Sequence, residues 1–141
     1  PAHFYRAILE GIAMEQRLAI DSIATASGEP VHQVNVLGGG AQSSLWCQIL
    51  ADTLNRPVLR TESPEATSLG AALLAALALG YFDSPHAAVE AMCRQTDAFY
   101  PSNAAPSYED LYSNVYKHIY PALRQPMTEL ARISKARKPS A

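Results

Sequence analysis

Three consecutive glycines separate an apolar, β-branched run from an amphipathic helix. Residues 31–37 are short and apolar enough to form a buried strand, and residues 38–40 cannot continue a strand interior. Ser43 or Ser44 can cap the helix that follows, whose apolar side chains lie on one side as far as about residue 54. This order predicts an α/β unit in which the glycines form the turn from strand to helix.

Helices dominate the rest of the chain. Apolar periodicity predicts helices at residues 4–26, 68–80, 85–94 and from about 107 onwards, a second short strand at 57–61, and a linker that opens at residue 99. The helix at 68–80 is apolar almost all round, which predicts burial on most of its sides. Pro121 is expected to kink or restart the last helix, because proline lacks an N–H and clashes with the preceding turn. A right-handed crossover would make the two strands parallel neighbours.

The length of 141 residues fits one domain. We expect this domain to occupy residues 1–125 and a partly disordered tail to occupy residues 126–141. Two parallel strands make a poor sheet on their own, because both outer edges stay unpaired. The chain also begins with Pro1 rather than methionine. We therefore expect further strands upstream of Pro1 and a chain that is part of a longer protein.

Charge and composition narrow the classes of partner. Eleven Lys and Arg against thirteen Asp and Glu give a net charge of −2, which argues against nucleic acid and against an anionic membrane surface. The longest apolar run, 69–79, is far shorter than the ~20 residues of a membrane span. Cys47 and Cys93 make no disulfide framework and are typical of buried cysteines in a reducing cytoplasm. The scattered histidines (His3, His32, His86 and His118) have no metal-ligand spacing.

A glycine turn before a capped helix can hold a phosphate. The first backbone N–H groups of a helix point outwards, the helix dipole adds positive charge there, and glycine lets a phosphate approach the backbone. No Gly-Lys-Ser/Thr follows, so this is not a Walker loop, and Ser43 stands where the dinucleotide motif needs its third glycine. A tight turn without any ligand stays open as the alternative.

Several blocks, in order, resemble the C-terminal half of the FGGY carbohydrate kinases. They are GGGAQSSLWCQILADTLNRPV, then EATSLGAALLAALALGYF, preceded by RAILEGIAMEQR. The closing FYPSNAAPSYEDLYSNVYKHIYPAL is similar to the end of the xylulokinase branch. The resemblance covers residues 6–123. It implies an α/β fold, an incomplete RNase H-like (actin-like ATPase) C-terminal domain that is mostly helical with a short parallel β pair.

The resemblance also implies an activity and a site. Members phosphorylate a sugar or polyol hydroxyl with ATP and Mg²⁺, in a cleft between two domains, and often form dimers. Gly39 and Gly40 match the glycines beside the nucleotide phosphates, and Ser43 matches a polar position at the start of the next helix. The candidate ATP-binding residues are Gly38, Gly39, Gly40, Ala41, Gln42 and Ser43. The helix that contains residues 70–72 is expected to pack behind this loop.

The general base and the sugar-binding residues of the family precede the matched region. Asp21, Asp52 and Asp83 have the pattern of helix-surface or turn aspartates, so we expect no turnover from this chain alone. The closing block favours a ketopentose such as xylulose as substrate. Two alternatives stay open: a non-catalytic ATP-binding regulatory module of the same fold, and a helical interaction domain without nucleotide.

Aromatic side chains leave two further choices open. Trp46 can stack on adenine, or it can pack in the core with the apolar residues of its own helix. Tyrosines recur every four residues along the last helix, at Tyr108, Tyr112, Tyr116 and Tyr120. They suit either a partner surface or a buried helix face with each hydroxyl at the rim, and the buried face is the commoner arrangement.

Overall fold

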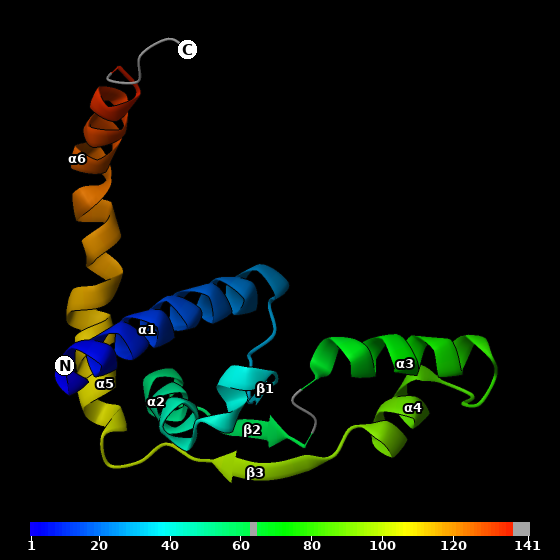
Figure 1. Cartoon of the computed structure of the whole chain (residues 1–141). Coiled ribbons are helices and arrows are strands. Elements are labelled where there is room, and N and C mark those ends of the chain that lie inside the picture. The colour runs from blue at the N-terminus through cyan, green and yellow to red at the C-terminus, as the bar shows by residue number, and fades with distance from the viewer. Residues whose placement is uncertain (63–64, 137–141) are drawn as a thin grey trace.

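The computed structural model describes residues 1–62 and 65–136 (Figure 1). Its elements are α1 (Ala2–Ser27), β1 (Val34–Val36), a 3₁₀ turn (Gly39–Gln42), α2 (Ser44–Leu54), β2 (Val58–Thr61), α3 (Ala66–Ala78), α4 (Pro85–Met92), β3 (Gln95–Phe99), α5 (Ala105–Leu111), a π-helical turn (Tyr112–Tyr116) and α6 (Lys117–Ala136). Helix α2 lies between α1 and the small sheet, α6 rises from one side of this body, and α3 with α4 projects from the other.

The sheet has three strands in the order β1-β2-β3. Strands β1 and β2 are parallel, as predicted, with Val34 opposite Val58. Strand β3 pairs antiparallel with β2 and was not predicted, since no element was expected at residues 95–98 and a linker was expected from residue 99. Its first four residues are exposed, so no apolar alternation marks it in the sequence. Pairing with β2, rather than side-chain burial, makes this segment a strand.

Local signals set most helix ends. Gly28 ends α1 in the left-handed conformation, with φ of 74°, and its amide donates to the Ala24 carbonyl. Ser84 caps α4 by accepting a hydrogen bond from the Ala87 amide at 3.2 Å, and Pro85 occupies the first helical position. These ends were predicted, because each depends only on residues within one turn.

The main core lies between α1, α2 and the sheet. Its buried members come mostly from α2 and are Ala13, Cys47, Ile49, Leu50, Ala51, Leu54 and Val58. Asp52 is also buried, at 5% exposure, so the prediction of a helix-surface aspartate was wrong. Its Oδ1 accepts hydrogen bonds from the Ser102 amide at 2.6 Å and from the Gln48 side chain at 3.1 Å. Asp52 thereby anchors the segment that follows β3 to helix α2.

A second cluster joins α1 to the C-terminal helices. Met14, Tyr108 and Tyr112 are buried together, with Tyr116 beside them. The three tyrosine hydroxyls donate to the acidic side chains of α1: Tyr108 to Glu10, Tyr112 to Asp21 and Tyr116 to Glu15, at 2.7–3.0 Å. The buried-face interpretation is confirmed for these three, whereas Tyr120 is 70% exposed.

The last helix does not restart at Pro121. Helix α6 runs through both Pro121 and Pro126, and the irregular turn lies earlier, at Tyr112–Tyr116. The expected tail begins at residue 126, but the helix continues to Ala136. Residues 137–141 of that tail lie outside the described residues. Within 1–62 and 65–136, no helix combines the length and the apolarity that crossing a membrane requires.

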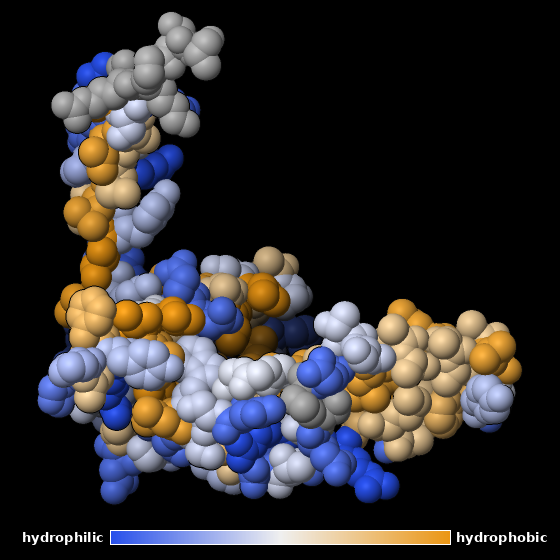
Figure 2. All heavy atoms as spheres, in the orientation of Figure 1, coloured by the Kyte–Doolittle hydropathy of each residue, from blue (hydrophilic) through white to orange (hydrophobic). Residues whose placement is uncertain are grey.

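Helix α3 is exposed, which contradicts the expected burial. None of its residues is buried, Leu74 is 70% exposed, and its main packing partner is α4. Figure 2 shows the resulting apolar surface along the projecting arm. The expectation that this helix packs behind the glycine loop was wrong for the same reason. A helix that is apolar on all sides needs neighbours on several sides, and the described chain provides mainly one.

Candidate functional site

The glycine turn, defined here as residues 38–43, is a single tight bend between β1 and α2. Gly38 has φ of +83°, a conformation that side chains rarely adopt, so glycine is required there. The turn closes through hydrogen bonds from the Ala41 amide to the Gly38 carbonyl, at 3.1 Å, and from the Ser43 amide to the Gly40 carbonyl, at 3.2 Å. Ser43 caps α2 by accepting from the Trp46 amide at 3.3 Å, as predicted.

The fold does not explain why residues 39 and 40 are glycines. Neither has a positive φ. A Cβ added at Gly39 would meet no described atom within 4 Å, and one at Gly40 would meet only the Trp46 ring at ordinary van der Waals distance, 3.8 Å. Their amides also donate to no acceptor among the described residues. Both exposed positions therefore combine an N–H group that has no acceptor among the described residues with room where a side chain would lie, and a phosphate-binding turn requires both.

Two hollows flank the turn. The first, of about 300 Å³, is called the polar hollow because most of the residues that line it are polar: Gly38, Ala41, Gln42, Arg60, Thr61, Glu62, Thr96 and Asp97. The second, of about 280 Å³, is mostly apolar, and Gly40, Ala41 and Trp46 line it together with residues of α1, β1 and α2. Gly39 and Ser43 line neither hollow. The structure thus brings four of the six predicted residues to these two hollows.

Trp46 belongs to the core, as its helical spacing indicated. It is half-buried and packs against the main core cluster. Its indole nitrogen also lies near Gly40, and its ring lines the apolar hollow. Adenine stacking on this ring stays a prediction.

Arg60 and Asp97 were not singled out in the sequence, yet Arg60 binds the glycine turn and Asp97 binds Arg60. Arg60 Nη1 donates to the carbonyls of Ala41 and Gln42, each at 3.2 Å. Arg60 Nε donates to Asp97 Oδ2 at 3.0 Å, and Nη2 contacts the same oxygen. No sequence signal links these residues, because the turn, β2 and β3 meet only in the folded chain.

Cys47 adds a second contact to the turn. It is fully buried, and its Sγ donates to the Ala41 carbonyl at 3.3 Å. Burial raises the pKa of the Cys47 thiol, despite the opposing effect of nearby Arg60, so the thiol stays protonated and able to donate. Cys47 therefore combines the predicted core role with support for the turn.

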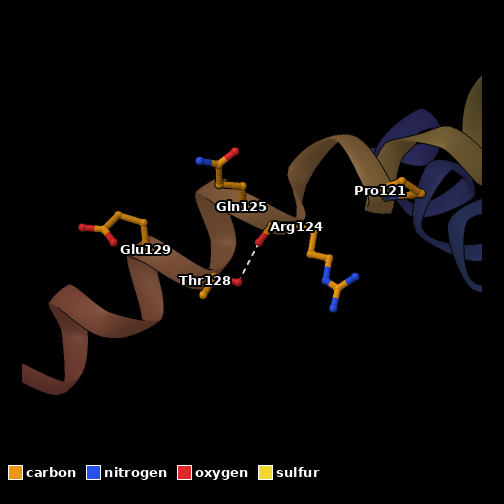
Figure 3. Close-up of a pocket in the computed structure, with 5 residues that line it drawn as sticks. All are labelled: Pro121, Arg124, Gln125, Thr128 and Glu129. Atoms are coloured by element: carbon orange, nitrogen blue, oxygen red, sulfur yellow. Dashed lines mark hydrogen bonds between the residues drawn. The ribbon is translucent and has the colours of Figure 1, made fainter.

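A larger hollow, of about 530 Å³, lies far from the turn. It runs along α6 and is lined by Pro121, Arg124, Gln125, Thr128 and Glu129. In Figure 3 these side chains point in different directions from one helix, and the only bond drawn is the local one from the Thr128 hydroxyl to the Arg124 carbonyl, at 2.8 Å. Side chains that do not converge give no binding site.

The described residues suit a nucleotide better than a metal bound by the protein alone. Free amides at Gly39 and Gly40 fit phosphate oxygens. In the described part of the chain, no group of three or more His, Cys, Asp or Glu side chains is placed to hold a metal ion. Mg²⁺ is commonly bound through phosphates with few protein ligands, so a nucleotide would itself bring most of the ligands.

Comparisons with known proteins identify the family and the fold of this chain. Xylulose kinase of Bacillus subtilis is 39% identical over 120 residues, which cover 82% of this chain and 24% of the kinase. The crystal structure of xylulose kinase from Rhodospirillum rubrum superposes with a TM-score of 0.70 at 29% identity, over 87% of this chain and 25% of that one. Plasmodium falciparum glycerol kinase, solved with ADP, gives a TM-score of 0.69 at 28% identity, over 84% of this chain and 24% of that one.

The chain spans about a quarter of the length of these relatives. Their fold is that of the actin-like sugar kinases, which confirms the expected architecture. A family model of the C-terminal domain of carbohydrate kinases matches residues 1–79, more than half of the chain. This chain therefore belongs to the FGGY family of carbohydrate kinases and corresponds to its C-terminal domain.

Proposed function

We propose that this chain is the ATP-binding part of a carbohydrate kinase, which transfers the γ-phosphate of ATP to a sugar or polyol hydroxyl. The observation that carries the proposal is the pair of amides at Gly39 and Gly40, which have no acceptor among the described residues and lie at positions that the fold does not require to be glycine. Family membership supports the same conclusion. An ADP-bound glycerol kinase among the structural relatives supports it further.

Each turn residue has a proposed role. Gly39 and Gly40 donate their N–H groups to the nucleotide phosphates. Gly38 supplies the left-handed conformation that starts the turn, and Ala41 and Gln42 border the polar hollow. Ser43 caps α2 and so holds the turn against the start of that helix. When bound with Mg²⁺, ATP supplies the phosphoryl group, and the ion offsets its charge.

We propose xylulose, a ketopentose, as the sugar. The support is the identity to xylulose kinases, together with the structural likeness to another one. The cytoplasm is the proposed compartment, with a homodimer as the proposed assembly and with no nucleic acid or membrane partner, in line with the near-neutral net charge. The general base and most sugar contacts are expected outside the quarter of the relatives that this chain matches.

Calorimetric titration with ADP and Mg²⁺ tests the proposal. We expect the chain to bind ADP, and Gly39→Asp to weaken binding at least tenfold, because its carboxylate would repel and block the phosphates. Gly70→Asp is the matched control, since Gly70 also has open space around it but lies in α3. This control should bind within about twofold of the original chain. The proposal fails if the unmodified chain binds no ADP, or if both variants bind it equally.

A further inference from the structure

The side chain of Arg60 connects the sheet to the glycine turn. Arg60 lies in β2 directly opposite Asp97 of β3, and its guanidinium is also 5.3 Å from the centre of the Phe99 ring. Only 19% of the Arg60 side chain is exposed. One end of the guanidinium is therefore fixed by β3, and the other end reaches the carbonyls of Ala41 and Gln42.

The contacts of Arg60 with the Ala41 and Gln42 carbonyls restrict the orientation of the turn. A carbonyl and the N–H of the next residue belong to one rigid peptide plane and point in opposite directions. Arg60 therefore fixes the planes that link Ala41 to Gln42 and Gln42 to Ser43. The Cys47 thiol holds the Ala41 carbonyl from a second side. The amides of Gly39 and Gly40 lie in earlier peptide planes of the same short turn and have no acceptor among the described residues.

Charge favours the same arrangement. The carbonyl end of a helical turn carries partial negative charge, so a cation beside it is stabilising. Asp97 balances the Arg60 charge, and the polar hollow is lined by both side chains as well as by Gly38. A planar guanidinium can bind one carboxylate and two carbonyls at once, whereas a lysine ammonium cannot reproduce this geometry.

We infer that Arg60, oriented by Asp97, is a positioning residue that holds the glycine turn in the shape that receives the nucleotide phosphates. The inference rests on the proposed function, and it adds residues from β2 and β3 to the site. Arg60 contacts the last carbonyls of the turn and not the glycines themselves. Its effect is transmitted through the carbonyls of Ala41 and Gln42.

The test compares ADP with adenosine, which lacks the phosphates. Arg60→Met should weaken ADP binding at least tenfold and change adenosine binding by less than twofold, with Arg60→Lys and Asp97→Asn giving smaller losses for ADP. Arg56→Met is the matched control, because Arg56 is similarly shielded and paired with Asp21, but away from the turn. It should leave both affinities within twofold of the original values.

Hydrogen exchange gives a readout that needs no nucleotide. The amides of Ala41 and Ser43 are bonded within the turn, so Arg60→Met should speed their exchange at least tenfold, and Arg56→Met should not. Equal losses of ADP and adenosine affinity, or an unchanged ADP affinity, would overturn the inference. So would unchanged exchange in Arg60→Met. If the unmodified chain binds no ADP, the proposed function fails first, and the exchange rates show whether Arg60 holds the turn.

Discussion

Single residues join the parts of this chain through buried polar contacts. Arg17 of α1 is only 9% exposed. It donates to the Thr53 carbonyl at 2.9 Å and to Glu109 at 2.5 Å, and its guanidinium lies 4.0 Å from the centre of the Tyr112 ring. One side chain therefore connects α1 to the end of α2 and to the C-terminal helices. Nothing in its sequence position marks it for this role.

The environment of Tyr112 predicts a pH dependence of stability. Burial, and then the hydrogen bond to Asp21, raise the pKa of Tyr112 from 10 to about 12. The folded state therefore keeps the phenol proton when the unfolded chain has lost it. The stabilising effect is complete below about pH 10 and is lost as the pH rises toward about 12.

Denaturant unfolding at several alkaline pH values tests this dependence. We expect the free energy of unfolding to fall between pH 10 and pH 12, and Tyr112→Phe to reduce that fall. Tyr120→Phe is the control, because Tyr120 is exposed. An equal alkaline loss in Tyr112→Phe and in the original chain would contradict the assignment to Tyr112.

At the scale of elements, the apolar composition of α3 does not match its exposed environment. The helix contains almost only apolar residues, yet it has none buried in the described chain, and α4 covers only part of it. Exposed apolar patches of this kind favour association. By contrast, α2 has an apolar composition and most of its residues are buried between α1 and the sheet, where its start supports the glycine turn.

The exposure of α3 predicts the effect of charged substitutions. Leu74→Lys should change the free energy of unfolding by no more than about 0.5 kcal/mol, because Leu74 loses little burial when it is replaced. It should also reduce association that depends on concentration, as measured by light scattering. The matched buried leucine is Leu54, which is 2% exposed. Leu54→Ala should cost about 2–5 kcal/mol. Equal costs at the two positions would contradict the exposure of α3.

At the scale of the whole molecule, two acidic side chains from other parts of the chain, Glu62 and Asp97, border the glycine turn. Asp97 borders the polar hollow and is paired with Arg60. Asp52 is buried and accepts the Ser102 amide. In the sheet described, β1 pairs on one side only, with β2. Under the proposed function, the general base lies outside the quarter of the relatives that this chain matches.

We therefore expect no sugar-dependent turnover from the chain by itself. A positioned carboxylate must take the proton of the sugar hydroxyl, and the general base of the family is expected outside the quarter of the relatives that this chain matches. The measurement is ATP consumption with xylulose and Mg²⁺, with Bacillus subtilis xylulose kinase as the positive control. Sugar-dependent consumption of ATP by this chain would contradict the expectation.

The sequence by itself determined the features that depend on neighbouring residues. A strand within residues 31–37, the glycine turn and a helix capped by Ser43 or Ser44 were predicted, because β-branching, glycine and a capping serine each act within one turn of chain. The ends of α1 and α4 follow from Gly28 and Ser84 in the same way. The resemblance to the kinase family also rests on ordered local blocks, and the comparisons confirmed it.

Tertiary structure decided the features that depend on distant residues. Strand β3 exists because β2 pairs with it, and Asp97 reaches Arg60 across 37 positions of chain. The burial of Asp52 and the exposure of α3 depend on which elements pack against them, whatever their own composition. Hydrophobic periodicity shows that a face can be buried, but only the arrangement of the other elements determines whether it is.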